Sequence, residues 1–276
     1  MTLHTHLEIA SGTDPGVVRT FNEDSIAIER DLGLLMLADG MGGYKAGDVA
    51  SAMATDLITD VLKQQRHSEM AQSMRQFSQL SDSSQAVKSA IEKINRVIYQ
   101  SAQTNEEYHG MGTTVVLMLF HDGWATIAHV GDSRLYRMRN DAFELLTHDH
   151  SLLQEQVEMG VISSDEAKYS HNRNLVTRAL GLDVDVKVDV CEIDVLPGDV
   201  YLLCSDGLND MVDDADIELV MSELQANLPL AVTQLIQMAN DNGGHDNVSV
   251  LIAKVQDEVN RKRSLQNSLF GWLKVF

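Results

Sequence analysis

Residues 32–43, LGLLMLADGMGG, decide the fold, because an apolar run is followed at once by Asp39 and Gly40. A short apolar run of this kind favours a buried strand. The Asp-Gly pair after it favours a turn where the strand ends, since Asp bonds nearby backbone and Gly tolerates positive φ. One such pair is explained by turn chemistry alone.

The same arrangement occurs three more times along the chain. WATIAHV precedes Gly131-Asp132, VYLLC precedes the turn at Asp206, and Asp246 comes just before the strand-like VSVLIA. Buried strands of one domain pack together, so the four carboxylates predict a shared acidic pocket. Crowded carboxylates repel one another and need protons or cations. Hard oxygen ligands suit magnesium, manganese or calcium better than zinc.

The composition is that of an acidic globular protein. The chain has 276 residues, of which 44% are hydrophobic, and its formal charge of −20 argues against a broad basic surface for nucleic acid. Cys191 and Cys204 lie in strand-like segments, so we expect reduced thiols in a reducing compartment. No secretory signal and no apolar run of about 20 residues is visible, which favours a cytoplasmic protein.

Strands and helices do not alternate strictly along the chain. Apolar segments predict strands at residues 7–11, 25–29, 33–37, 113–120, 124–130, 134–138, 188–193, 200–204 and 248–255. Helical spacing of apolar residues predicts helices at 46–66, 84–103, 214–224 and 229–240, with a loose connection at 67–83. This order favours an α+β fold over a doubly wound sheet. We expect two packed antiparallel sheets flanked by helices, an α-β-β-α sandwich.

The chain reads as one domain followed by a tail. Residues 1–256 contain no internal repeat and no domain-sized linker. Residues 257–276 carry Arg261, Lys262 and Arg263 and end in an aromatic cluster that includes Trp272 and Phe276. Such a tail fits a partner groove or a membrane surface, and packing against its own domain fits equally well.

Eight motifs carry a resemblance to a known family. In chain order they are RTFNEDS (19–25), ADGMGG (38–43), GMGTT (110–114), HVGDSR (129–134), LTHDHS (146–151), NLVTRALG (174–181), LCSDGL (203–208) and GGHDNVS (243–249). Together they resemble the metal-dependent serine/threonine phosphatases of the protein phosphatase 2C (PPM) family in their bacterial form. The resemblance spans residues 12–255, and no single motif is specific enough alone.

The resemblance implies a set of metal ligands. Asp39 matches the carboxylate that bridges two metal ions, and the carbonyl of Gly40 matches a ligand of the second ion. Asp206 and Asp246 match the remaining carboxylates of the first ion. Asp132 matches a residue that helps Asp206 to hold a third, weaker ion. The implied cofactors are two, or with this weaker site three, Mn²⁺ or Mg²⁺ ions.

Three residues near the N-terminus are implied to act around those ions. Glu23 and Asp24 match acids that reach the ions through bound water, and Arg19 matches the arginine that grips the substrate phosphate. A guanidinium suits that task because it offers a planar pair of donors. The structural alternatives are turn capping by Glu23 or Asp24 and a surface ion pair between Arg19 and one of them.

The implied reaction is hydrolysis of phosphoserine or phosphothreonine in proteins. Two cations lower the pKa of a water held between them and neutralise charge on the phosphoryl group, so no protein nucleophile is needed. The implied partners are phosphorylated proteins, such as a bacterial serine/threonine kinase or its targets. Eukaryotic members carry a His where this chain has Met41, which leaves the general acid open.

Two further segments have simpler interpretations. His148, Asp149 and His150 are metal-binding residue types, but a helix cap by Asp149 or Ser151, with the histidines supporting the loop, explains them better. Residues 160–174 resemble the mobile flap beside the family's active site, so we expect them to influence substrate choice.

Other functional classes fit the sequence less well. A cysteine phosphatase needs Arg six residues after its Cys, whereas Pro197 and Asp210 stand at that distance. A Ser-His-Asp hydrolase is disfavoured because no G-x-S-x-G turn is present. The remaining alternative is a catalytically silent, metal-stabilised module that binds phosphoproteins or a kinase. Retention of every proposed ligand and of Arg19 disfavours that alternative.

Overall fold

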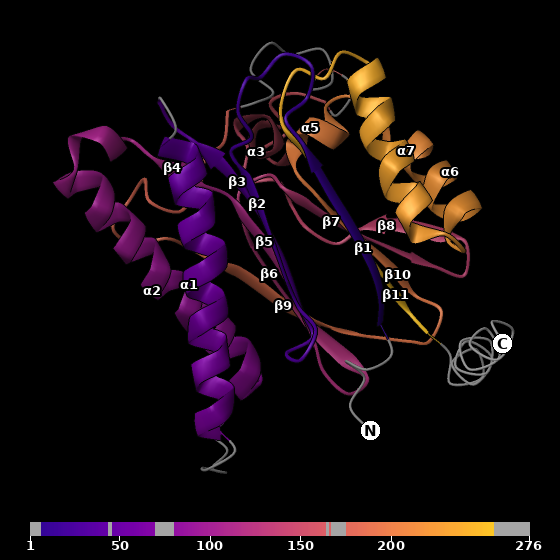
Figure 1. Ribbon diagram of the computed structural model, residues 1–276, viewed down its shortest axis with the longest axis horizontal. Helices are drawn as coiled ribbons and strands as arrows, with labels where there is room; N and C mark the ends of the chain where they lie inside the picture. Colours follow the sequence, from indigo (N-terminus) through magenta and orange to yellow (C-terminus); the bar gives the residue numbers. More distant parts are fainter. Residues whose placement is uncertain (1–6, 44–45, 70–79, 164–165, 167–174, 257–276) are drawn as a thin grey trace, which may run out of the picture.

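Two antiparallel sheets pack face to face and helices cover their outer faces, as a computed structural model shows (Figure 1). The structure describes residues 7–43, 46–69, 80–163, 166 and 175–256. The first sheet has the spatial order β1 (Leu7–Asp14), β11 (Val248–Val255), β10 (Val200–Cys204), β7 (Arg134–Arg139) and β8 (Ala142–Leu145). The second has the order β2 (Asp24–Glu29), β3 (Leu34–Met41), β5 (Val115–Phe120), β6 (Trp124–Val130) and β9 (Asp189–Asp194), with β4 (Gly112–Thr113) paired to β3.

The apolar run of β3 shows why the sheets stack in this way. Successive side chains of a strand point to opposite faces, so Leu35 and Leu37 enter the core between the sheets. Leu34 and Met36 pack instead under the helices that cover the second sheet. Each fully buried side chain of this size contributes roughly 1.5–3 kcal/mol, so a strand buried on both faces has to be apolar throughout.

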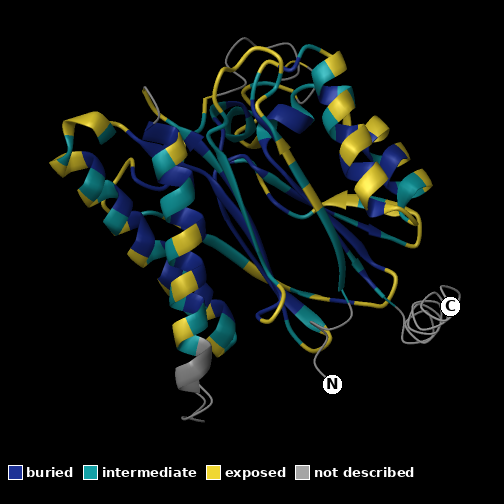
Figure 2. Cartoon of the chain, viewed as in Figure 1, coloured by how far each residue is buried: buried dark blue, intermediate teal, exposed yellow. Residues whose placement is uncertain are grey.

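Helices cover each sheet in pairs. Helices α1 (Ala46–Glu69) and α2 (Asp82–Thr104) lie over the second sheet, and α6 (Asp214–Leu224) and α7 (Leu228–Asp241) lie over the first (Figure 1). Helix α2 buries a stripe formed by Val87, Ile91, Ile94 and Ile98. Shorter helical segments are η2 (Glu106–Tyr108), α3 (Leu152–Glu158) and α5 (Asp206–Asn209). Figure 2 shows buried residues between the layers and exposed residues on the outer helix faces, so the predicted α-β-β-α sandwich is confirmed.

Two of the four predicted turns are parts of regular elements instead. Asp39 and Gly40 lie within β3, because Asp24 of β2 pairs with the first and Thr113 of β4 with the second. Asp206 is the first residue of the short helix α5. Strand pairing and helix formation therefore override the local turn preference at these two places. Asp132 and Asp246 lie in bends between elements, as predicted.

The hairpin of β7 and β8 and the connection between α1 and α2 also differ from the prediction. Strand β8 was not predicted because it is short and mostly exposed, although Asn140 and Asp141 at φ 49° and 64° form the turn before it, as this residue pair favours. The predicted connection at 67–83 is shorter, since α1 runs to Glu69 and α2 begins at Asp82. The Ser81 side chain caps α2 by accepting a hydrogen bond from the Ser84 N–H.

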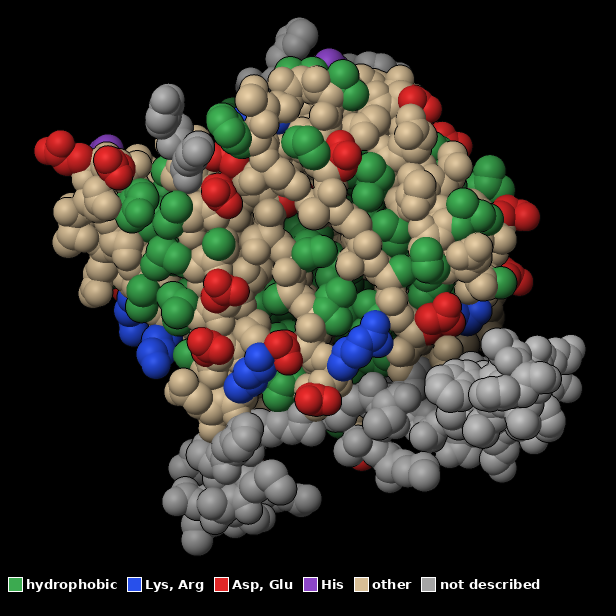
Figure 3. Space-filling model, in the orientation of Figure 1, with side chains coloured by type: hydrophobic (Ala, Val, Ile, Leu, Met, Phe, Trp, Pro, Cys, Tyr) green, Lys and Arg blue, Asp and Glu red, His purple; other side chains and the backbone are tan. Residues whose placement is uncertain are grey.

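Several predictions concern residues outside the described part of the chain. Most of the flap-like segment 160–174 and all of the tail 257–276 fall there, so their roles stay predictions. Among the residues that are described, no helix combines the length and apolar character needed to cross a membrane. On the face shown in Figure 3, Lys and Arg lie along the lower edge and acidic side chains are scattered, so this face carries no broad basic patch.

Candidate functional site

The predicted acidic residues meet at one end of the sandwich, where β3 ends and α5 begins (Figure 1). Asp39 lies near the end of β3, Asp132 follows β6, and Asp206 opens α5. Asp246 precedes β11, and Asp24 begins β2. Elements of both sheets therefore deliver carboxylates to a single region, as the sequence predicted.

Electrostatic coupling shows that these acids share one region. Burial first, and then the charges of Asp24, Asp206, Asp132 and Asp246, raise the pKa of Asp39 well above its ordinary value. Burial and neighbouring acids likewise raise the pKa of Asp206 well above its ordinary value. Burial is also the main cause that raises the pKa of Asp132 to about 7 and that of Asp24 to about 6. The site therefore favours protons or other cations at these positions.

The backbone of Asp39 is fixed by Thr113 of β4 and by Thr114, which lies between β4 and β5. Its N–H donates to Thr114 Oγ1 at 3.0 Å, and its carbonyl oxygen accepts from the Thr114 N–H at 2.8 Å and from Thr113 Oγ1 at 2.9 Å. Thr114 Oγ1 also shares a hydrogen bond of 2.8 Å with Ser133 Oγ. One threonine thus connects the strand that carries Asp39 to the loop that carries Asp132.

Asp24 links the second sheet to α5. It stands directly opposite Asp39 in the β2–β3 pair, and like charges in this position repel. Its Oδ2 accepts a hydrogen bond of 2.8 Å from Ser205 Oγ, the residue before Asp206. Asp24 Oδ1 and Asp206 Oδ1 are buried and have no hydrogen-bond partner among the described residues.

The ion pair of Arg19 is with Asp246 and not with Glu23 or Asp24 as in the surface-pair alternative, although the charge of Arg19 also lowers the pKa of Glu23 against the larger raising effect of burial. Its Nη2 donates to Asp246 Oδ2 at 2.6 Å, and about half of the Arg19 side chain is exposed to solvent. The guanidinium is therefore at the edge of the acidic region and within reach of a solute.

Asn247 holds the Arg19 loop in place and was missed from the sequence. Its Oδ1 accepts from the Glu23 N–H at 2.8 Å, and its Nδ2 donates to two carbonyl oxygens of the β1–β2 loop at 2.9 and 3.0 Å. The only sequence signal for this role was that Asn247 is a second polar residue directly after Asp246. The hydrogen-bond partners of Asn247 lie more than 200 residues away in the sequence.

The Glu23 carboxylate lies beside the first turn of α1, a position that fits both the capping alternative and a metal-water role. It accepts hydrogen bonds from the backbone of Gly47 and Asp48, in the first turn of α1, where negative charge is favoured. Gly40 packs against the same turn, since a Cβ on Gly40 would overlap the carbonyl oxygen of Gly47. The close approach of β3 to α1 therefore requires glycine at this position.

The acidic group extends to Asp210, which sequence reasoning did not assign to the site, and to Asp149, which it assigned to a helix cap. The charge of Asp210 raises the pKa values of Asp206 and Asp132. Asp210 is the C-cap of α5, four residues after Asp206, and this spacing was the available sequence signal. Asp149 also raises the pKa of Asp132, while its own carboxylate pairs with Arg134 at 2.7–3.1 Å.

The LTHDHS motif behaves as its simpler interpretation predicted. Ser151 caps α3 by accepting a hydrogen bond from the Gln154 N–H at 3.3 Å, and the His148 carbonyl oxygen lies 2.9 Å from His129 Nε2. Asp149 is paired to Arg134 and does not cap the helix.

The donor set of the acidic region fits hard divalent cations. Its members offer carboxylate oxygens, two of which are buried without a hydrogen-bond partner in the described part of the chain. Asp39, Asp206 and Asp246 are half-buried, so a cation and a substrate can reach them from solvent. Elsewhere in the described residues, His129, His150 and Asp189 place three ligating atoms within 4.8 Å of one another. The carboxylates of the acidic region are spaced more widely than these three atoms.

Comparison with known proteins identifies the family. The profile of the family described as protein phosphatase 2C matches residues 12–247. The chain belongs to the protein phosphatase 2C family. The serine/threonine phosphatase stp of Listeria innocua is 36% identical over 245 residues, which cover 88% of this chain and 93% of that protein. Family membership makes the chain a protein serine/threonine phosphatase of the bacterial type, a phosphoric monoester hydrolase.

Solved structures of this family share the fold. The serine/threonine phosphatase PstP/Ppp of Mycobacterium tuberculosis superposes with a TM-score of 0.79 at 32% identity, covering 91% of this chain and 99% of that one. The catalytic domain of PstP in complex with two manganese ions gives a TM-score of 0.75 at 33% identity, again covering 91% and 99%. The family's two-sheet architecture is therefore preserved over nearly the whole length of both chains.

Proposed function

We propose that the acidic region holds two Mn²⁺ or Mg²⁺ ions, and a third more weakly, and hydrolyses phosphoserine and phosphothreonine in proteins. The observation that carries the proposal is the meeting of Asp39, Asp206 and Asp246 beside Arg19, with Asp206 Oδ1 buried and unbonded among the described residues. The manganese complex of the PstP catalytic domain supports the choice of metal.

Each predicted residue has a place in this proposal. Asp39 and the carbonyl of Gly40 would hold the pair of ions, with Asp206 and Asp246 completing the set on one of them. Asp132 and Asp206 would hold the third ion, which fits the raising effect of the Asp132 charge on the pKa of Asp206. The acids would have to lose their protons as the cations bind, because a carboxylate binds metal in its ionised form.

Bound ions would lower the pKa of a water between them and neutralise charge on the phosphoryl oxygens. Arg19 would bind two oxygens of the substrate phosphate, and its half-exposed guanidinium is free to reach outward from Asp246. Glu23 and Asp24 would orient water at the ions. Their contacts with the start of α1 and with Ser205 keep both carboxylates fixed at the site.

The biological setting is part of the same proposal. We assign as substrates phosphorylated proteins, in particular a bacterial serine/threonine kinase or its targets, in line with the bacterial phosphatases that the chain resembles. A cytoplasmic signalling role is supported by two unpaired cysteines, Cys191 and Cys204. Residues 1–256 would form the phosphatase domain, and the tail 257–276 would contact a partner or a membrane surface.

Turnover of p-nitrophenyl phosphate with Mn²⁺ separates the enzyme from a silent binding module. The wild-type protein should hydrolyse the substrate, and Asp39→Asn should not, although both proteins remain folded by circular dichroism. Equal, background-level turnover by the two folded proteins would reject the proposed function and favour the binding module.

A further inference from the structure

His150 holds both backbone groups of Gly131, the residue before Asp132. The Gly131 N–H donates to His150 Nδ1 at 3.1 Å, and the Gly131 carbonyl oxygen accepts from the His150 N–H at 3.0 Å. The His150 side chain is only 4% exposed. The course of the chain into Asp132 therefore depends on residue 150, which is 18 positions further along the sequence.

Gly131 has a conformation that needs such support. Its φ is 110°, and a Cβ at this position would lie 2.6 Å from the Thr114 side chain. Few residues other than glycine adopt this backbone geometry. If the buried Gly131 N–H lost its acceptor, this backbone conformation would become less stable relative to alternative ones. The equilibrium constant between them would change by a factor of about ten or more.

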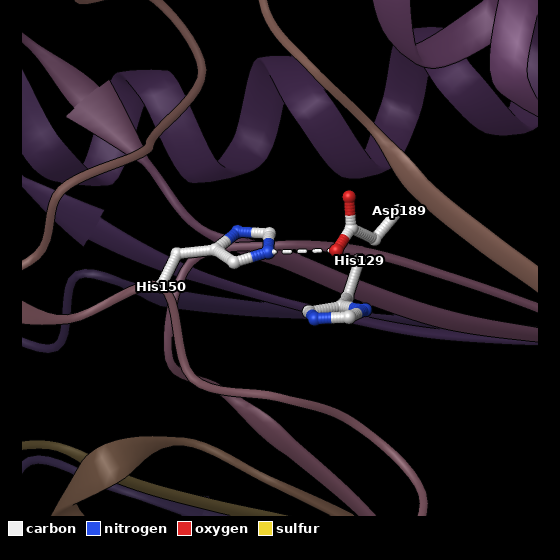
Figure 4. A group of neighbouring side chains, drawn as sticks. All are labelled: His129, His150 and Asp189. Atoms are coloured by element: carbon white, nitrogen blue, oxygen red, sulfur yellow. Dashed lines mark hydrogen bonds and ion pairs between the residues drawn. The ribbon is translucent and has the colours of Figure 1, made fainter. Parts of the chain in front are cut away.

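The other side of the His150 ring is fixed from β9 (Figure 4). Nε2 lies 3.3 Å from Asp189 Oδ2, and the ring stacks on His129 with centroids 4.7 Å apart. Burial lowers the pKa of His150 to about 4, so the ring is neutral and one nitrogen accepts while the other donates. Acceptance from Gly131 at Nδ1 places the hydrogen on Nε2, where Asp189 Oδ2 is its acceptor. Arg178 Nη1, which also lies 3.0 Å from Nε2, has no lone pair to accept this hydrogen and donates to Asp189 Oδ1 at 3.4 Å instead.

A metal ion among His129, His150 and Asp189 is a competing interpretation that the contacts disfavour. The three side chains offer ligating atoms within 4.8 Å of one another. However, the lone pair of His150 Nδ1 is used by Gly131, and the Arg178 guanidinium lies 3.0 Å from Nε2 and 3.4 Å from Asp189 Oδ1. A cation would have to displace that positive charge and reverse the His150 tautomer.

We propose that His150 is a positioning residue for the phosphatase reaction: its Nδ1 holds the Gly131 peptide so that the Asp132 carboxylate stays beside Asp206. The proposal rests on the proposed function, because Asp132 matters for turnover only if the acidic region binds the reactive cations. Its consequence is specific to one ring atom. Loss of the Nδ1 acceptor should weaken the most loosely held Mn²⁺ and leave the fold in place.

Two substitutions at His150 separate its two ring nitrogens. His150→Asn can place an amide oxygen near the position of Nδ1, whereas His150→Gln reaches the position of Nε2 and leaves the Gly131 N–H without its acceptor. His148→Gln is the matched control, because the His148 ring is exposed and belongs to the same motif. The measurements are p-nitrophenyl phosphate turnover and the melting temperature, each as a function of Mn²⁺ concentration, so that Mn²⁺ binding is followed independently of activity.

We expect His150→Gln to raise the half-saturating Mn²⁺ concentration about tenfold, and His150→Asn and His148→Gln to remain within about threefold of wild type. Equal Mn²⁺ dependence in His150→Asn and His150→Gln, whether normal or weakened, would overturn the proposal. A wild-type protein without turnover would instead reject the proposed function, so the two failures are distinguishable.

A second variant keeps the test decisive if His150→Gln does not fold. Asp189→Leu removes the acceptor of the Nε2 hydrogen at a half-exposed position, and so frees the ring to turn away from Gly131. It should raise the half-saturating Mn²⁺ concentration in the same direction. A folded Asp189→Leu protein with wild-type Mn²⁺ dependence would contradict the positioning role.

Discussion

Replacing Asp132 by Asn should stabilise the metal-free protein, and the gain should grow with pH. Burial and the neighbouring Asp149 and Asp210 raise the pKa of Asp132 from 3.8 to about 7. The folded protein therefore binds a proton that the unfolded chain has already released. Stability from this group is fully present below the unfolded pKa and is lost as the pH rises through the folded pKa.

The size of the effect follows from the two pKa values. Each pH unit between 3.8 and about 7 is worth roughly 1.4 kcal/mol in the free energy of unfolding. The wild-type protein should therefore lose up to ~4 kcal/mol by pH 8 relative to a side chain that cannot ionise. Asn has nearly the same shape and stays neutral, so the difference between the two proteins should be small near pH 4 and largest at pH 8.

Urea unfolding in EDTA at pH 4.5, 6 and 8 measures this difference. The expected free energy of unfolding of Asp132→Asn exceeds that of wild type by ~1 kcal/mol at pH 4.5 and by ~2–4 kcal/mol at pH 8. A difference that is constant across this pH range, or a variant that is less stable than wild type at pH 8, would refute the reasoning.

The remaining predictions concern the cations and the substrate. Asp206→Ala and Asp246→Asn should lose turnover far more than stability, and wild-type activity at saturating Mn²⁺ would reject them as ligands. Added Mn²⁺ should raise the melting temperature, since a ligand at 100 times its Kd stabilises by ~2.7 kcal/mol; a melting curve that stays in place across a Mn²⁺ titration would argue against the site. Arg19→Ala should raise KM severalfold, whereas Arg96→Ala, at an exposed ion pair with Asp185, should not; an unchanged KM would remove Arg19 from the phosphate pocket. Asn247→Ala should lower stability by ~1–3 kcal/mol in thermal or urea unfolding, because the Glu23 N–H loses its acceptor; unaltered stability would show that solvent replaces this bond.

The sequence predicted the layers correctly, and the acidic residues that it singled out lie in one region of the structure. Apolar runs such as the one ending before Asp39 are buried on both faces, and a strand of this kind belongs in the middle of a layered fold. Residues at strand ends, such as Asp206 and Asp246, then had to meet at one end of the sandwich. Their particular roles came from the family resemblance, because apolar patterns do not distinguish a ligand from a turn residue.

The parts that were missed depend on contacts between distant residues. Asp39 continues a strand only because Asp24 and Thr113 pair with it from other strands. Asn247 matters because it reaches Glu23, and His150 because it reaches Gly131. No local pattern contains such information, since a hydrogen-bond partner across the fold leaves no trace in the spacing of neighbouring residues.

Anomalous diffraction at the manganese edge, from a crystal soaked in Mn²⁺, tests the central claim most directly. The account predicts strong peaks among Asp39, Asp206 and Asp246, with a weaker peak between Asp132 and Asp206. A crystal with no peak among these carboxylates, or with manganese only at His129, His150 and Asp189, would contradict it.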